Sequence, residues 1–108
     1  AFDDISVSIS YSEKDPAKIK KILEGVVAGH PLVLKSPKPV VRLDGFGDYG
    51  YQFIIRGYVS SVHTLALLEI ASDVRIALVS TLQQEGIELA SVVVSIIGQG
   101  DAKKNGLE

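Results

Sequence analysis

Ile5-Ser6-Val7-Ser8-Ile9-Ser10 alternates apolar and hydroxyl side chains without a break, and the rest of the fold is arranged around this stretch. Successive side chains of a β-strand point to opposite faces. The alternation therefore predicts a half-buried strand with its isoleucines and valine on the covered face and its serines on the open face. Asp15-Pro16 follows closely, an N-cap residue with proline at the first helical position. We therefore expect a strand that leads directly into a helix.

The first predicted helix carries one apolar stripe at helical spacing, formed by Ile19, Ile22, Leu23, Val26 and Val27. Lysines occupy its other side, and Gly29 and Pro31 end it. A proline-bracketed connector covers residues 32–38. Residues 40–46 and 51–60 then read as the two strands of a hairpin, joined by a turn at Gly47-Asp48-Tyr49-Gly50.

A second helix is predicted from about residue 62 to residue 85, capped by Ser60 or Ser61 and stopped by Gly86. Its main stripe consists of Leu67, Ile70, Ala71, Val74, Leu78 and Leu82. A simple amphipathic helix has no need of the additional apolar row formed by Leu68, Ile76 and Val79. Residues 92–97 form a β-branched run that reads as a last strand.

The resulting order, β-α-β-β-α-β, predicts an α+β ferredoxin-like two-layer sandwich. In it, both helices cover one face of a four-stranded antiparallel sheet. We expect one domain over residues 1–98, with the first and third strands central. Residues 99–108 form a polar tail that ends in a possible vector remnant. The chain lacks methionine, so we read it as a fragment of a larger protein.

Several function classes find little support in the sequence. The net charge of −2 gives no electrostatic basis for binding nucleic acid, and the absence of cysteine excludes disulfides and thiolate metal sites. His30 and His63 have no second ligand at helical spacing, so we predict no metal and no cofactor. We interpret His30 as a charge at a helix C-terminus. No serine has an activating histidine nearby in sequence, so we predict that the chain is not an enzyme.

The glycines of the hairpin match G-x-G-x-x-G between Gly45 and Gly50, the pattern of dinucleotide-binding loops. A strand follows the pattern here, whereas a dinucleotide-binding loop leads into a helix. We interpret these glycines as turn residues.

Of the predicted surfaces, the open face of the sheet says most about the function of the domain. Aromatic and arginine side chains there fit a protein–protein interface. Base stacking on RNA is an alternative for such a face. The alternative function for the domain as a whole is a small-molecule-sensing regulatory module of ferredoxin-like fold, attached to an enzyme or a transporter. For subunit contacts we predict Phe46, Ile54, Arg56 and Tyr58.

A family resemblance appears in the proline-to-glycine run at residues 33–48, VLKSPKPVVRLDGFGD, followed by the strand segment FIIRGYV. Upstream, VSISY leads into a helix, and downstream a helix ends in Glu85-Gly86-Ile87. In these features the chain resembles the cytoplasmic domain of the small-conductance mechanosensitive channel (MscS) family.

This resemblance implies a vestibule and assembly domain of an osmotic release valve. It implies a homo-oligomer, usually of seven subunits, whose pore helices lie outside this fragment. The full-length protein is then expected in the bacterial inner membrane, with this part on the cytoplasmic side. The net charge, and not the resemblance, leads us to expect no nucleic acid among its partners.

Overall fold

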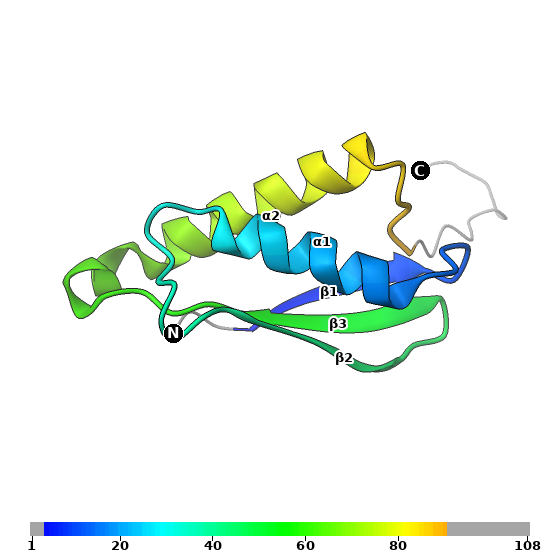
Figure 1. Ribbon diagram of the computed structural model, residues 1–108, viewed down its shortest axis with the longest axis horizontal. Coiled ribbons are helices and arrows are strands. Elements are labelled where there is room, and N and C mark those ends of the chain that lie inside the picture. Colours follow the sequence, from blue (N-terminus) through cyan, green and yellow to red (C-terminus); the bar gives the residue numbers. More distant parts are fainter. Residues whose placement is uncertain (1–3, 91–108) are drawn as a thin grey trace, which may run out of the picture.

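The computed structural model describes residues 4–90, in which two α-helices cover one face of a three-stranded antiparallel sheet (Figure 1). The strands are β1 (Ile5–Ser10), β2 (Val40–Phe46) and β3 (Gly50–Arg56), arranged in the order β1-β3-β2. The helices are α1 (Pro16–Ala28) and α2 (Leu67–Gln84), and the short 3₁₀-helix η1 (Ser61–Ala66) precedes α2. The predicted α+β class is confirmed.

The chain that leaves α2 returns to β1 on the side away from β3. Leu89 forms an antiparallel bridge with Ile9. The Ser10 N–H donates to the Glu88 carbonyl, and the Ala90 N–H donates to the Ser8 carbonyl, each at 2.9 Å. β1 therefore has hydrogen-bonded neighbours on both sides at this end. The predicted fourth strand, residues 92–97, and the predicted tail, residues 99–108, lie outside the described residues.

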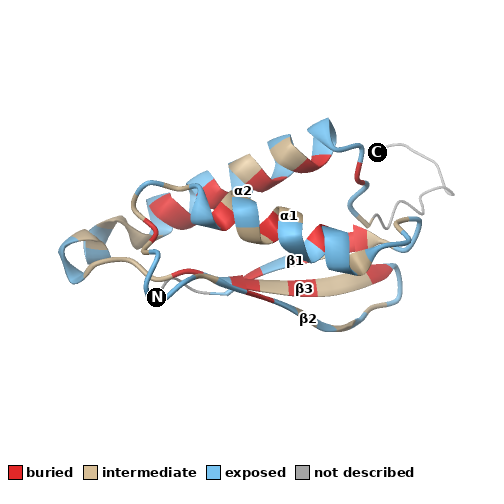
Figure 2. Ribbon diagram, in the orientation of Figure 1, coloured by how far each residue is buried: buried red, intermediate tan, exposed pale blue. Residues whose placement is uncertain are grey.

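The alternation in β1 has the predicted result. Ile5, Val7 and Ile9 are buried, and they lie opposite Ile55, Phe53 and Tyr51 of β3. Figure 2 shows the buried positions gathered where the helices face the sheet. No polar side chain is buried in this core within residues 4–90. Its members are Ile5, Val7, Ile9, Ile19, Leu23, Val27, Val33, Val41, Phe53, Ile55, Ile70, Ala71, Val74, Leu78, Leu82 and Ile87.

The first helix begins as predicted. The Asp15 side chain accepts a hydrogen bond from the Lys18 N–H, and Pro16 occupies the first turn. This carboxylate satisfies one of the backbone donors that a helix leaves free at its N-terminus. The helix ends at Ala28 with Gly29 as its cap, as the sequence indicates.

The second helix begins later than predicted, because residues 61–66 form a 3₁₀-helix instead of a first α-helical turn. Ser60 is the cap, with its hydroxyl accepting from the Val62 N–H. Val62 and Thr64 are β-branched and favour the α-helix only weakly. Val62 is 80% exposed and Leu65 fully exposed, so no packing against the core compensates for this preference.

The end of α2 is a Schellman turn. The Ile87 N–H donates to the Leu82 carbonyl and the Gly86 N–H to the Gln83 carbonyl. Gly86 has a φ of 70°, which glycine adopts without the steric cost that a Cβ would bring. Ile87 is buried directly after this turn. Gly86 therefore ends the helix, as predicted, and directs the chain back toward β1.

Candidate functional site

The open face of the sheet is the side that neither helix covers (Figure 1). The residues of three strands meet on it in rows: Ser6 lies opposite Ile54, and Ile54 lies opposite Arg42. Arg56 lies opposite Val40 in the next row. Serines, arginines and two aliphatic side chains therefore form a mixed surface in which Ile54 is half-buried. The composition resembles that of a protein–protein interface more than that of an enzyme cleft.

Two of the four predicted contact residues, Ile54 and Arg56, take the predicted positions on this face. Tyr58 lies beyond it, because β3 ends at Arg56 and not at Ser60 as predicted. The residue after Arg56 would pair with Pro39, which has no N–H to donate to a ladder. The Tyr58 carbonyl instead accepts a hydrogen bond of 2.7 Å from the Leu34 N–H in the connector.

Phe46 was predicted on the open face, and this position is wrong. The register between β2 and β3 shifts between Leu43 and Gly45, so one extra residue enters β2. Beyond this bulge the side chains change face. Phe46 therefore lies opposite Tyr51 on the helix-covered side, with the two ring centroids 6.4 Å apart. Because the helices do not reach it, 75% of its surface stays exposed.

Arg56 is held in place by an acidic neighbour. Its Nε donates to the Asp4 carboxylate at 2.8 Å. This hydrogen bond and the charge of Asp4 raise the pKa of Arg56 above its already high ordinary value, and the Tyr58 hydroxyl adds to the effect. The guanidinium is therefore charged at every physiological pH. Because the pair is exposed to water, it orients the arginine more than it stabilises the fold.

The G-x-G-x-x-G pattern forms the hairpin turn, as predicted, and the Gly47 N–H donates to the Gly50 carbonyl at 2.9 Å. Its glycines are not in the left-handed region, since among residues 4–90 the glycine with positive φ is Gly86. Gly50 is required for a different reason. A Cβ at this position would collide with the backbone carbonyl of Ile9, so Gly50 allows β1 and β3 to approach closely.

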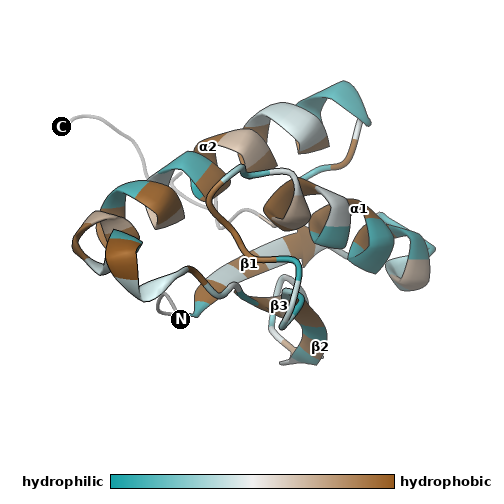
Figure 3. Cartoon of the chain, turned by 60° about the vertical axis from the view of Figure 1, so that its left-hand side comes forward, coloured by the Kyte–Doolittle hydropathy of each residue, from teal (hydrophilic) through white to brown (hydrophobic). Residues whose placement is uncertain are grey.

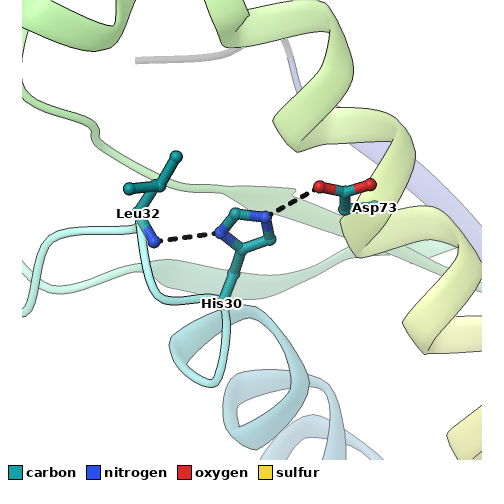
Figure 4. Close-up of polar contacts among 3 residues, drawn as sticks. All are labelled: His30, Leu32 and Asp73. Atoms are coloured by element: carbon teal, nitrogen blue, oxygen red, sulfur yellow. Dashed lines mark hydrogen bonds and ion pairs between the residues drawn. The ribbon is translucent and has the colours of Figure 1, made fainter.

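His30 connects the two helices (Figure 4). Its Nδ1 accepts from the Leu32 N–H and its Nε2 lies 3.0 Å from the Asp73 carboxylate. With Nδ1 as the acceptor of the Leu32 N–H, Nε2 is the nitrogen that donates to Asp73. The interpretation of His30 as a charge at the helix C-terminus stays a prediction. Among residues 4–90 no three potential ligands are grouped around a metal site.

Two shallow grooves flank α2. One, of about 320 Å³, lies between β1 and α2 and is lined mainly by apolar side chains together with Arg75; we call it the β1–α2 groove. The other, of about 390 Å³, lies between α1 and α2 beside His30 and Asp73. Neither groove gathers a nucleophile, a base and an oxyanion donor from the described residues.

The outer side of α2 is apolar, as the additional row in the sequence indicates. Leu68 is 82% exposed, Ile76 67% and Val79 45%. Figure 3 shows the hydrophobic segments that continue from this helix into η1 at one end of the molecule. The sequence predicted this row, but it gave no signal that Val79 borders a groove together with Arg75 and Leu89.

Comparison with known proteins identifies the family to which this domain belongs. The family profile described as "Mechanosensitive ion channel MscS, C-terminal" matches residues 3–89. The chain belongs to the MscS family. It is 30% identical over 84 residues to a protein of Archaeoglobus fulgidus described as "Uncharacterized MscS family protein". The match covers 77% of this chain and 28% of that relative.

Proteins of the MscS family are oligomeric membrane channels and not enzymes, so membership agrees with a surface suited to self-association. Within residues 4–90, no helix is both long enough and apolar enough to cross a bilayer. α2 has the length, with 18 residues, but it includes Glu69, Asp73 and Arg75.

Proposed function

We propose that this MscS family domain is the cytoplasmic vestibule and assembly part of a mechanosensitive channel subunit. It belongs to a valve that releases solutes when membrane tension rises, and it contacts other copies of itself in a closed ring of seven. The pore and the tension sensor lie in parts of the polypeptide outside this chain. The cytoplasmic side of the cell membrane, in a bacterium the inner membrane, is the proposed location.

The observation that carries this proposal is the family match over residues 3–89. The surface composition of the domain supports it. Apolar side chains are exposed on the outer side of α2 and at the hairpin, and the open sheet face mixes aliphatic and arginine side chains. Monomeric proteins rarely leave large apolar patches uncovered. The grooves of the described residues, by contrast, show no catalytic arrangement.

The channel activity is tested with the natural full-length protein in cells that lack other mechanosensitive channels. We expect its expression to raise survival after an abrupt drop in external osmolarity, and membrane patches to show tension-activated currents. A full-length protein that reaches the membrane and gives neither response would disprove the channel function.

The subunit contacts are tested at the open face. Ile54 and Arg56 lie on this face, Tyr58 lies just beyond β3, and Phe46 lies at the hairpin end. The double variant Ile54→Ala/Tyr58→Ala should reduce the oligomer fraction measured by light scattering of the detergent-purified full-length protein. Lys20→Ala, on the exposed side of α1, is the matched control and should leave the oligomer unchanged. An intact oligomer in the double variant would remove these residues from the interface.

A further inference from the structure

The β2–β3 hairpin and the β1–α2 groove are separate surfaces of one subunit, although the hairpin residue Gly50 lies close to Ala90 at one end of the groove. The sheet order β1-β3-β2 puts β2 at one edge, while the groove is bordered by β1 near the other edge. Phe46 and Tyr49 are not among the residues that line the groove of their own subunit, and both side chains are exposed. A neighbouring copy placed head to tail can bring its hairpin to this groove, and contacts of this heterologous kind form rings when the rotation closes.

The hairpin exposes side chains that commonly anchor interfaces. Phe46 is 75% exposed and Tyr49 is 54% exposed, although both are large aromatic residues. The hairpin is fixed in position by the Tyr11 hydroxyl, which donates to the Gly47 carbonyl at 2.6 Å. Exposed aromatic side chains on a rigid support lose little conformational entropy when they bind, and such residues dominate the binding energy of interfaces.

The groove has the complementary character. Its lining is apolar at Leu78, Val79, Leu82 and Leu89, and Val79 and Leu89 are themselves 45% and 44% exposed. Its volume of about 320 Å³ suits a small number of side chains. Arg75 lies at the same groove, and a guanidinium over an aromatic ring is favourable.

Charge also matches between the two surfaces. Asp48 is exposed at the tip of the hairpin, and Arg75 is exposed at the groove. The ion pairs among residues 4–90 join Lys20 to Glu24, His30 to Asp73, Arg42 to Asp44 and Arg56 to Asp4. Neither Asp48 nor Arg75 takes part in an ion pair with another described residue.

We propose that the β2–β3 hairpin of one subunit docks in the β1–α2 groove of the next subunit, with Phe46 and Tyr49 on its apolar lining and Asp48 beside Arg75. The inference rests on the proposed assembly function and names the two surfaces that meet. Its partner is a second copy of this chain. Because donor and acceptor surfaces differ, every subunit of a ring uses both once.

Disulfide cross-linking tests this contact in the natural full-length protein in its membrane. These 108 residues contain no cysteine, and any cysteine elsewhere in the protein is replaced by serine. We expect the double variant Tyr49→Cys/Val79→Cys to give a ladder of covalently joined subunits on oxidation. Each single variant should give no ladder. Tyr49→Cys/Lys20→Cys is the matched control, and it should also give none, because Lys20 lies on the exposed side of α1.

Charge exchange is a second, independent measurement. Arg75→Asp and Asp48→Arg should each lower the cross-linking yield roughly fivefold, because each places like charges together. The combined variant Asp48→Arg/Arg75→Asp should restore the yield, since it rebuilds the pair with reversed sign. Failure of the combined variant to recover any yield would contradict the proposed pairing.

The remaining outcomes are distinguishable. If amine-reactive cross-linking detects a ring but the cysteine pair gives no ladder, the docking is wrong and the assembly function stands. If no oligomer of any kind is found, both are wrong. An intrachain disulfide in Val79→Cys/Val93→Cys would place the chain's own residues in the groove and overturn the docking of a neighbour.

Discussion

The two helices bury similar apolar stripes against the same sheet but present opposite surfaces to the outside. α1 buries Ile19, Leu23 and Val27, and its outer side carries Lys20 and Glu24, whose charged groups lie 3.6 Å apart. α2 also buries a stripe of aliphatic side chains, yet its outer side exposes Leu68, Ile76 and Val79. An outer surface like that of α1 is suited to water, and that of α2 to a partner.

This difference separates folding from assembly within one domain. The inner stripes of both helices are required for the core, so changes there should alter stability equally on either helix. The outer residues of α1 and α2 make few contacts within the subunit, so only those of α2 should matter, and only for association. The predictions below test this separation from the largest expected effect to the smallest.

The inner stripes should respond alike. Leu23→Ala on α1 and Leu78→Ala on α2 remove fully or almost fully buried side chains. Each should lower the free energy of unfolding by about 2–5 kcal/mol through lost burial and the cavity left behind. Chemical denaturation followed by circular dichroism measures this effect. Ile76→Ala on the outer side is the control, with a change within about 0.5 kcal/mol. A comparable loss in the control would show that Ile76 belongs to the core.

The outer sides should respond differently. Ile76→Lys on α2 should leave the free energy of unfolding nearly unchanged and weaken self-association of the full-length protein roughly tenfold, or about 1.4 kcal/mol. The cause is a charge placed in a surface that a partner covers. Lys20→Ala on α1 should change neither quantity. Analytical ultracentrifugation in detergent measures the association of the unaltered protein and of both variants. Equal association of these three proteins would refute the assignment of α2 to the interface.

Two glycines should respond with opposite signs. Gly86→Ala should destabilise the domain by about 1 kcal/mol, because alanine is strained at the φ of 70° that ends α2. Gly25→Ala lies within α1, where an added Cβ meets no atom within 4 Å. It should stabilise the domain by about 0.5–1 kcal/mol through its higher helix propensity. Thermal unfolding of both variants measures the shifts, and shifts of the same sign would contradict this account.

The polar link between the helices should have the smallest effect. Asp73→Ala removes the acceptor of the His30 Nε2–H, and because Asp73 is exposed we expect a loss of about 0.5 kcal/mol. Asp73→Asn keeps an amide oxygen as acceptor and should lose less. ¹⁵N NMR of the imidazole should show a proton on Nε2 and none on Nδ1. The opposite tautomer would disprove the hydrogen-bond assignment.

Much of the fold could be predicted because simple periodicities decide it. The alternation of Ile5, Val7 and Ile9 requires one covered face, and the spacing of Ile19, Leu23 and Val27 requires one covered helix side. Patterns of this kind predicted the antiparallel hairpin, both helices and the apolar core between the helices and the sheet. The position of Gly86 gave the end of α2 because few other residues adopt its conformation.

What the sequence did not predict depends on interactions between distant segments. The late start of α2 results from the absence of any core next to Val62 and Leu65. The end of β3 at Arg56 results from Pro39, which directly precedes the neighbouring strand β2. The hydrogen bonds of the His30 ring depend on the Leu32 N–H and on Asp73, which is 43 residues away. The missing core contacts and the link from His30 to Asp73 have no signature in a local pattern, whereas the β-branched Val62 and Pro39 were visible signals.

The site was predicted only in part. Ile54 and Arg56 lie on the open face as predicted, and their role in assembly stays a prediction. Phe46 was assigned to the wrong face because the strand pattern was continued across the bulge. Asp44-Gly45 was the available signal, since a glycine inside a strand pattern indicates a bulge.

The bulge in β2 makes the orientation of the hairpin tip depend on a single residue, Asp44. Val41 and Leu43, which contribute to the core, lie before the extra residue, while the exposed tip lies after it. Deletion of Asp44 would therefore rotate the tip by half a turn and carry Phe46 to the opposite side of the sheet, with the core left in register. The gain or loss of one codon at this position would therefore change the surface that the hairpin presents to a partner and leave the core unchanged.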